Sequence, residues 1–244
     1  MPNATARNHD PSTDQTGLEP EFDWSRVQTV FLDLDGTLLD LHFDNHFWHE
    51  HLPDRYAQRK GRSPAEARAL ISAHIRKIEG SLSYYCLDYW RDFLELDLVA
   101  LKQEIAGRIA LRPEVENFLT YLQTLGKRTV LLTNAHPDSV ALKFRHIPIQ
   151  HHFHRVITSH SLGIAKENPS FWSSLQQIEP FESEHTLFID DNLQVLCNAK
   201  RHGLRYLLTI AQPDSNLPPR QSDDFPALDC FKQLMNGSAP AQLA

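Results

Sequence analysis

Two aspartates stand two residues apart where an apolar segment near the start of the chain ends. The stretch "VFLDLDGTLLD" places Asp33 and Asp35 directly before Gly36 and Thr37. In an extended strand, residues i and i+2 point to the same face, so the two carboxylates would repel each other. This repulsion requires a neutralising partner, which must come from elsewhere in the chain or from a bound cation.

Polar side chains recur near the ends of three later apolar segments. Thr133 and Asn134 follow one segment, Asp190 and Asp191 follow another, and Lys166 lies in the loop after a third. Ligands of open parallel sheets bind at the carboxyl ends of the strands, so we expect these side chains to converge with the first pair. The resulting set of carboxylates, a hydroxyl and an ammonium group suits phosphoryl transfer.

Each group in this set has a role in such a reaction. Asp33 would attack phosphorus and form an aspartyl-phosphate, while Asp35 would protonate the leaving oxygen and then activate water. The Thr133 hydroxyl, the Lys166 ammonium and backbone N–H groups near Asn134 would bind phosphate oxygens. Mg²⁺ prefers a few carboxylates together with water and a substrate phosphate oxygen, and Mn²⁺ is the alternative ion. We assign the metal site to Asp33, Asp35, Asp190 and Asp191.

The elements that must position these residues form an α/β pattern. Segment 28–33 is continuously apolar, as expected for a strand covered on both faces. Over 41–109 helical spacing dominates, and Ser63, Pro64 and Glu66 form an N-cap, a first-turn proline and a capping box. After this helical insertion, strands and helices alternate, which predicts a parallel sheet flanked by helices.

The alternating part has four further strands. We predict these strands at 128–133, 155–159, 185–190 and 205–210, the last being the final strand of the sheet. We predict helices at 113–126, 137–146, 168–178 and 192–203. Asn168 and Pro169 are expected to begin the third of these helices, and 225–235 could form a short docking helix.

These patterns divide the chain into four parts. Its first residues are polar and aperiodic, which is typical of a mobile tail. The predicted parts are a disordered tail over 1–24, an α/β core formed by 25–40 and 111–212, a helical insertion over 41–110, and a C-terminal extension over 213–244.

Composition limits the partners. The net charge of −7 over 244 residues argues against a nucleic-acid polymer or an anionic membrane as a charge-driven partner. No apolar stretch reaches the ~18 residues of a membrane span, and no signal peptide is recognisable. Three widely spaced cysteines, Cys86, Cys197 and Cys230, indicate no disulfide framework. We therefore predict a cytoplasmic enzyme, monomer or homodimer, whose partner is a small phosphate ester.

The fourteen histidines include two clusters, at 42–51 and 146–154. Neither cluster has the H-E-x-x-H order of a zinc hydrolase. His42 and His46 could share a helical face and bind a metal. The alternative, which we adopt, is that the clusters are surface and rim histidines.

Four motifs together resemble those of the haloacid dehalogenase (HAD) superfamily. They are "DLDGT", "LLTN", the lysine of "GIAKENPSFW" and "FIDDN", and the resemblance covers about 28–210. It implies a Rossmann-like core, a helical cap inserted after the first strand, and a Mg²⁺-dependent phosphatase. By this resemblance Asp33 is the nucleophile, Asp35 the acid/base and Asp191 a direct metal ligand. Thr133 and Lys166 match the phosphate-binding hydroxyl and the charge-neutralising lysine, and Asp190 would act on the metal through water.

Longer stretches are similar to the bacterial GMP/IMP nucleotidases. These are "LDLDGTLLDLHFDNHFW", "YYCLDYW", "LLTNAHP" and "LFIDDN". The similarity implies purine 5′-nucleotides as substrates. The alternatives are a phosphatase for phosphoglycolate or a sugar phosphate, a phosphomutase, and a non-catalytic protein that binds a phosphate ligand.

Aromatic residues of the cap have two interpretations. They could form the cap's own core, which is the usual fate of such residues. Alternatively, one or two could stack on a purine, a contact that contributes ~1–3 kcal/mol per base. Beside Thr133, Asn134 and Lys166, the candidate substrate-binding residues are therefore Phe43, Asp44, Asn45, Phe47, Trp48 and Tyr85.

Overall fold

A six-stranded parallel sheet forms the centre of the α/β part, in a computed structural model that describes residues 23–235. The strand order is β3-β2-β1-β4-β5-β6, and each neighbouring pair of strands is parallel. The strands are β1 (Thr29–Leu32), β2 (Arg128–Thr133), β3 (Arg155–Thr158), β4 (Thr186–Ile189), β5 (Tyr206–Ile210) and β6 (Ala227–Leu228). The strand order reverses beside β1, which is where ligands bind in open sheets of this kind.

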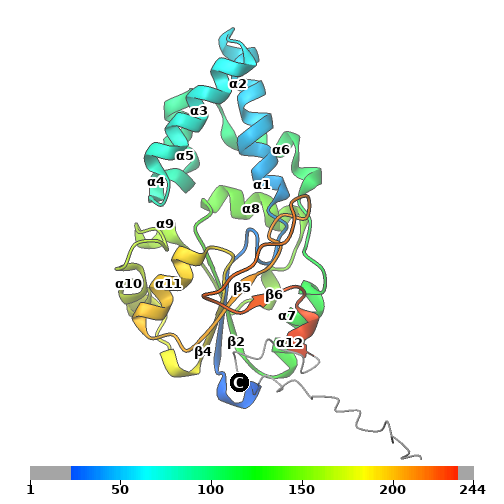
Figure 1. Ribbon diagram of the computed structural model, residues 1–244, viewed down its shortest axis with the longest axis vertical. Coiled ribbons are helices and arrows are strands. Elements are labelled where there is room, and N and C mark those ends of the chain that lie inside the picture. Colours follow the sequence, from blue (N-terminus) through cyan, green and yellow to red (C-terminus); the bar gives the residue numbers. More distant parts are fainter. Residues whose placement is uncertain (1–22, 236–244) are drawn as a thin grey trace, which may run out of the picture.

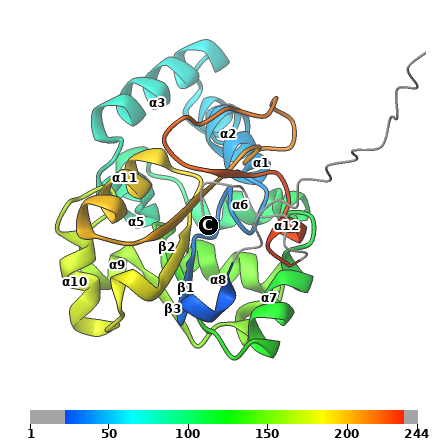
Figure 2. The same cartoon turned by 60° about the horizontal axis from the view of Figure 1, so that its bottom comes forward.

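Helices cover both faces of the sheet (Figures 1 and 2). They are α7 (Val115–Thr124), α8 (Pro137–His146), α9 (Ser159–Leu162), α10 (Phe171–Ile178), α11 (Leu193–His202) and α12 (Lys232–Met235). The first core, which contains Leu32 and Leu131, is completed by α7, α8 and α12. The second core, on the other face, contains Phe31 and Val130 and is completed by α10 and α11. Strand residues alternate between two cores, and this explains why the strands are continuously apolar.

A second group of helices stands over the carboxyl ends of the strands (Figure 1). It consists of α1 (His42–His46), the π-helical turn η2 (Phe47–His51), α2 (Leu52–Lys60), α3 (Pro64–Ile78), α4 (Leu82–Tyr85), α5 (Leu87–Leu94) and α6 (Leu98–Glu104). These helices, called the cap below, share a core of their own that includes Phe47, Ile71 and Trp90. An antiparallel bridge between Leu39 and Leu111 joins the chain where it leaves and re-enters the α/β part.

Short 3₁₀ turns connect several elements. They are η1 (Trp24–Arg26), η3 (Ala106–Arg108), η4 (Gln150–His152) and η5 (Ser183–His185). In the part of the chain that the structure describes, every helix is too short or too polar to cross a bilayer.

The predicted fold class is confirmed, and so are several local signals. Ser63 accepts a hydrogen bond from the Glu66 backbone while the Glu66 carboxylate accepts one from Ser63, so the capping box is formed. The helix predicted at 137–146 has those bounds as α8. Gly203 ends α11 in the left-handed conformation that favours glycine.

Other expectations are wrong at particular residues. Asn168 accepts a hydrogen bond from the Ser170 backbone, which closes a turn, and α10 begins only at Phe171. The strand at 206–210 is not the last, because β6 pairs with it in parallel, and the expected docking helix is reduced to α12. The predicted tail includes Trp24, but the ring of Trp24 packs against Phe118 and Tyr121. The rest of the predicted tail, 1–22, lies outside the described residues, as do 236–244.

Candidate active site

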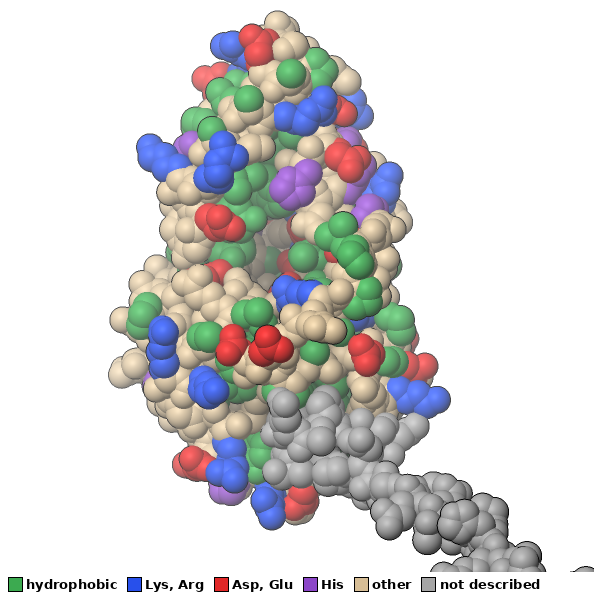
Figure 3. Space-filling view, viewed as in Figure 1, with side chains coloured by type: hydrophobic (Ala, Val, Ile, Leu, Met, Phe, Trp, Pro, Cys, Tyr) green, Lys and Arg blue, Asp and Glu red, His purple; other side chains and the backbone are tan. Residues whose placement is uncertain are grey.

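A pocket of about 900 Å³ lies between the cap and the carboxyl ends of the strands. Figure 3 shows the hollow from one side, with acidic side chains in and around it. Its floor includes Asp33, Thr133 and Asp190, and its cap wall includes Trp48 and Tyr84. Two parts of the fold that are separate in sequence therefore build one cavity.

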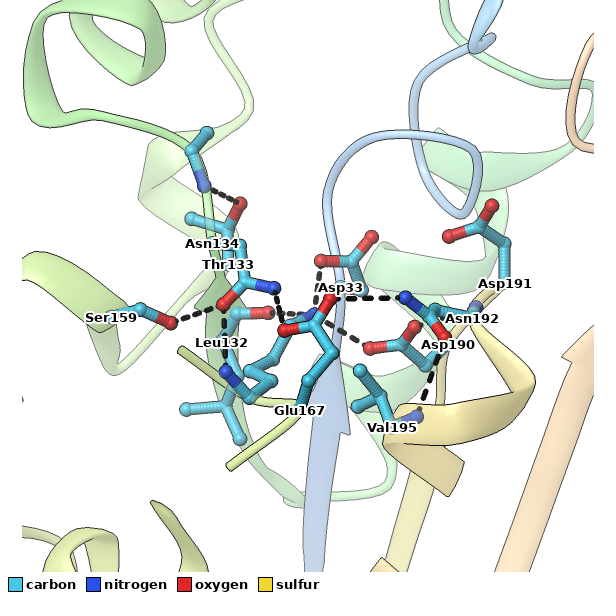
Figure 4. Close-up of polar contacts among 12 residues, drawn as sticks. Asp33, Leu132, Thr133, Asn134, Ser159, Glu167, Asp190, Asp191, Asn192 and Val195 are labelled. Carbon is cyan, nitrogen blue, oxygen red and sulfur yellow. Dashed lines mark hydrogen bonds and ion pairs between the residues drawn. The ribbon is translucent and has the colours of Figure 1, made fainter. Parts of the chain in front are cut away.

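Three carboxylates meet at the floor of the pocket. Asp33 follows β1, and Asp190 and Asp191 follow the neighbouring strand β4 (Figure 4). One oxygen from each lies within 4.8 Å of the others. Gly36 has φ +83°, and a Cβ at this position would lie 2.7 Å from the Asp191 carboxylate, so the turn after Asp35 requires glycine.

Lys166 is the cation of this cluster. Its Nζ donates to Asp33 Oδ1 at 2.5 Å and to Asp190 Oδ2 at 2.6 Å, and it also donates to the Leu132 carbonyl. Burial alone would lower the pKa of Lys166, but the charges of Asp190 and Asp33 raise it above its usual value. The ammonium group is therefore charged and fixed between two strand ends.

One lysine does not balance three carboxylates. Burial raises the pKa of Asp33 to about 6 against the attraction of Lys166. Burial, with the charges of Asp190 and Asp33, raises the pKa of Asp191 far above its usual value. With all groups ionised the net charge would be −2, and the donors are all oxygens. This arrangement fits Mg²⁺, which prefers oxygen ligands and a small number of carboxylates.

Asp35 belongs to a different cluster. Its Oδ2 lies 2.6 Å from the Nζ of Lys143 on α8, and the same Nζ lies 2.7 Å from Asp44 on α1. The other oxygen of Asp44 lies 2.6 Å from Lys102 on α6. Two lysines and two carboxylates therefore connect the first strand end to the cap. Asp44 keeps a pKa well below its usual range, because Lys102 and Lys143 outweigh the opposing effect of burial.

The two oxygens of the Asp35 carboxylate have different surroundings. Lys143 binds Oδ2, whereas Oδ1 is buried and has no hydrogen-bond partner within residues 23–235. Burial, together with the charges of Asp44 and Asp33, raises the pKa of Asp35 to about 6. The metal assignment of this carboxylate is not supported, since the compact carboxylate group contains Asp33, Asp190 and Asp191 without it.

Thr133 and Asn134 lie at the predicted place but have different surroundings. The Thr133 hydroxyl oxygen accepts a hydrogen bond from the Ala135 N–H, which leaves its proton available to a ligand. The Asn134 side chain donates to Glu167 and accepts from Ser159 and from the Lys166 backbone (Figure 4). Asn134 therefore holds the loop that presents Lys166.

The cap candidates divide into two groups. Trp48 and Tyr85 line the pocket, and the Tyr85 hydroxyl donates to Glu167 across the boundary between the cap and the α/β part. Phe43 and Phe47, in contrast, are almost fully buried, in the first sheet core and the cap core respectively. These two aromatic residues are structural, and their assignment to base binding is wrong.

The two polar cap candidates line the pocket, but their side chains are already engaged. Asp44 is held by Lys102 and Lys143, and the Asn45 amide donates to Asp214 at 2.7 Å. Neither is positioned as a free reader of a base edge. Their role, as the structure gives it, is to connect the cap to neighbouring segments.

The histidine clusters are engaged in local contacts. His42 contacts Asn216 and Arg108, and His46 lies 2.9 Å from Glu50. In the described part of the chain, the two groups with metal-ligand geometry do not include either of them.

Three site residues were missed from the sequence. Lys143 lies on a mixed helix with no motif to mark it, and Glu167 directly follows the predicted Lys166. Arg220 comes from a proline-containing loop, yet it lines the pocket and its guanidinium donates to the backbone carbonyl of Asp191. Of these three residues, only Glu167 could have been predicted from the sequence, because it directly follows the motif residue Lys166.

Comparisons with known proteins agree with this geometry. A family model of haloacid dehalogenase-like hydrolases matches residues 27–196. The protein called GMP/IMP nucleotidase YrfG from Escherichia coli K12 is 37% identical over 212 residues, which cover 87% of this chain and 96% of that relative.

Solved structures share the fold. A HAD phosphatase from Thermococcus onnurineus has a TM-score of 0.71 at 19% identity, covering 86% of this chain and 99% of that one. The HAD-type hydrolase YfnB from Bacillus subtilis, solved with magnesium bound, has a TM-score of 0.57 at 17% identity, covering 86% and 97%. At these identities the likeness concerns the fold alone.

The family match and the placement of its residues define the class. The chain belongs to the haloacid dehalogenase-like hydrolases. Within that family it is a phosphatase, an enzyme that hydrolyses phosphate monoesters.

Proposed function

We propose that this phosphatase is Mg²⁺-dependent and hydrolyses purine 5′-nucleotides, GMP or IMP, to the nucleoside and phosphate. The observation that carries the proposal is the group of three carboxylates and one lysine at the floor of a capped pocket. The substrate class is supported by the 37% identity to a protein named as a GMP/IMP nucleotidase, over nearly the full length of both chains.

Asp33, Asp190 and Asp191 are the residues that would hold the metal. When bound, Mg²⁺ neutralises excess negative charge and polarises a phosphate oxygen. Lys166 holds one Asp33 oxygen at 2.5 Å and so fixes the orientation of the carboxylate. Fixed orientation is itself a large part of catalysis, because little reorganisation remains at the moment of reaction.

The first chemical step transfers the phosphoryl group to the protein. An Asp33 oxygen attacks phosphorus while the bond from phosphorus to the nucleoside oxygen breaks, and an aspartyl-phosphate forms. Asp35 gives its proton to the leaving oxygen. Its Oδ1, which is buried and unpartnered among the described residues, is the oxygen available for this transfer.

The second step releases phosphate. Water attacks phosphorus, Asp35 accepts the proton from that water, and Asp33 leaves as a carboxylate. The pKa of Asp35, raised to about 6 by burial, suits a group that must alternate between both forms near neutral pH. Lys143 holds the other Asp35 oxygen and is a positioning residue for both steps.

Two further groups would bind the phosphate. The Thr133 hydroxyl can donate its proton to a phosphate oxygen, because its oxygen already accepts from Ala135. Lys166 adds positive charge beside the transferring group. Asn134 contributes indirectly by holding the Lys166 loop.

The cap wall can distinguish bases. Trp48 and Tyr84 stand with their rings 22° apart and 6.4 Å between centroids, and both line the pocket. Arg76 and Glu79 lie at the same wall. Guanine and hypoxanthine share an N1–H donor and an O6 acceptor, which match a carboxylate and a guanidinium, whereas adenine offers the opposite pattern. This complementarity supports GMP and IMP over AMP.

The proposal includes a cytoplasmic location. The three cysteines are unpaired, which suits a reducing compartment. The oligomeric state, monomer or homodimer, stays a prediction.

A substrate panel tests the proposal. Phosphate release is measured from GMP, IMP, AMP, phosphoglycolate and a sugar phosphate, each with Mg²⁺, with Mn²⁺ and with chelator. We expect the highest kcat/KM for GMP or IMP, lower values for AMP, and no turnover with chelator. A preference for phosphoglycolate or the sugar phosphate would replace the substrate class, and no hydrolysis of any ester would contradict the enzymatic function.

A further inference from the structure

A second group of potential metal ligands lies where the cap meets the α/β part. Cys86 precedes α5 of the cap, whereas His136 precedes α8 and His160 lies on α9. One ligand atom from each lies within 4.8 Å of the others. The set contains sulfur and nitrogen donors, in contrast to the all-oxygen set of Asp33 and its neighbours.

His160 is the member that most needs an explanation. Both of its ring nitrogens are buried, and neither has a hydrogen-bond partner among residues 23–235. Buried polar atoms are nearly always hydrogen-bonded, because an unpaired buried nitrogen costs free energy. A bound metal ion would give one of these nitrogens the partner that it lacks.

The other two members are arranged for the same purpose. Cys86 Sγ accepts a long hydrogen bond from the Tyr89 N–H, which fixes the sulfur at the start of α5. His136 Nε2 lies 3.5 Å from the Asp88 carboxylate, also on α5. Asp88 is therefore an oxygen donor close to the three proposed ligands.

We propose that Cys86, His136 and His160 form a zinc site that ties the cap to the α/β part. One thiolate and two neutral imidazoles are typical Zn²⁺ ligands, and they leave a fourth position for water or Asp88. Mg²⁺ does not compete, because it binds oxygen ligands. The site is thus chemically separate from the phosphatase cluster and takes a different ion.

Occupancy of this site is coupled to the pocket through adjacent residues. Tyr85 precedes Cys86, Asn134 stands two residues before His136, and Ser159 precedes His160. These three side chains form one hydrogen-bonded group with Glu167 beside Lys166. A metal that draws the cap and the α/β part together therefore fixes this group, restricts cap movement and slows substrate exchange.

Cobalt provides the direct test, because a thiolate bound to Co²⁺ gives a charge-transfer absorption in the near ultraviolet that carboxylates do not give. The full-length protein, cleared of metal and then supplied with excess Mg²⁺, is titrated with Co²⁺. We expect this band to saturate with one Co²⁺ per chain and to be displaced by Zn²⁺. Absence of the band would overturn the proposal.

Matched variants locate the ion. Cys86→Ser keeps a side chain that caps α5 well and removes the thiolate, so we expect a folded protein without the band. His160→Asn should weaken Zn²⁺ binding by more than about tenfold. Cys230→Ser, whose thiol is far along the chain, should behave as the unaltered protein. A band that persists in Cys86→Ser would overturn the assignment.

Inhibition tests the coupling. With Mg²⁺ in excess, Zn²⁺ should slow phosphate-ester hydrolysis by the unaltered protein and should affect Cys86→Ser much less. Equal inhibition of both would mean that Zn²⁺ acts at the carboxylates, and the coupling would be wrong. The cobalt experiment does not depend on turnover, so a failure of the proposed substrate class would leave it intact.

Discussion

The molecule contains two buried clusters of lysines and carboxylates that differ in their charge balance. The strand-end cluster consists of Asp33, Asp190, Asp191 and Lys166. The cap-side cluster consists of Asp35, Asp44, Lys102 and Lys143. The first has three carboxylates for one lysine, whereas the second has two of each.

This difference in charge balance indicates different roles for the two clusters. Buried charges are costly unless they are paired, so the surplus negative charge of the strand-end cluster favours a bound cation and supports the proposal that the chemistry takes place there. The cap-side cluster is already paired, and it joins Asp35 at the first strand end to α1 and α6 of the cap. Its contribution is to position Asp35 and the cap wall.

The largest expected effect comes from replacing one carboxylate in each cluster, which tests whether the two clusters have different roles. Asp33→Asn should lower kcat for phosphate release by at least about 10⁴-fold, because no nucleophile remains. Asp44→Asn should retain turnover, since Asp44 is paired with Lys102 and Lys143 and is not one of the proposed metal ligands. Steady-state kinetics on the preferred ester measure both. Comparable losses in the two variants would refute the division of roles.

Replacing a lysine in each cluster tests the charge balance. In chelator, Lys166→Met and Lys143→Met should each lose about 3–5 kcal/mol of unfolding free energy, because each leaves buried carboxylates without their cation. Mg²⁺ should restore part of the loss in Lys166→Met and none in Lys143→Met, because the proposed Mg²⁺ site lies in the strand-end cluster and not in the cap-side cluster. Urea denaturation with and without Mg²⁺ gives these values, and equal recovery would contradict the assignment.

Metal binding to the unaltered protein gives a smaller effect with a defined pH dependence. Mg²⁺ at 100 times its Kd should add about 2.7 kcal/mol of stability. The pKa of Asp33 is raised from 3.8 to about 6, so in the metal-free protein the ionised carboxylate lowers the free energy of unfolding. This destabilisation is complete above pH 6 and is absent below pH 3.8. The stabilisation by Mg²⁺ should therefore shrink as the pH falls from 7.5 to 5.5, because protons compete with the metal.

Variants sharpen this measurement. Asp191→Asn should lose the stabilisation by Mg²⁺, and Asp44→Asn should keep it. Thermal unfolding followed by circular dichroism at each pH records the shift. A metal-dependent shift that survives in Asp191→Asn would place the ion elsewhere.

The smallest effect concerns the cap wall beside the cap-side cluster. Lys102 Nζ lies 5.8 Å from the ring centroid of Trp48, which lines the pocket. Trp48→Ala should lower kcat/KM for GMP relative to a sugar phosphate by about 1–3 kcal/mol, roughly 5- to 150-fold, through lost stacking. Phe43→Leu serves as the control, because Phe43 is buried away from the pocket. An unchanged ratio in Trp48→Ala would remove this residue from base binding.

The strand-end cluster could be predicted from the sequence because its residues are fixed by local geometry. An apolar strand ends directly before each acidic group, and parallel strands bring their carboxyl ends to one edge. The Ser63 capping box and the glycine that ends α11 are local in the same sense. Such features depend on a few consecutive residues, so they can be predicted from the sequence alone.

The cap-side cluster could not be predicted in this way. Lys143 meets Asp44 across 99 residues, and Lys102 meets Asp44 across 58. Phe43 and Trp48 are both aromatic and stand five positions apart, yet packing buries one and exposes the other to the pocket. Strand β6 could not be predicted, because its two residues are too few to show the alternation of apolar and polar side chains that marks a strand.

Short-range patterns of apolar and polar residues are enough to predict strands β1 to β5, the helices between them and the chemical groups at the strand ends. They do not show which lysine neutralises which carboxylate or which aromatic side chains face the pocket. These pairings depend on how the cap packs on the α/β part. That packing is set by contacts between residues far apart in the chain, and no local pattern records them.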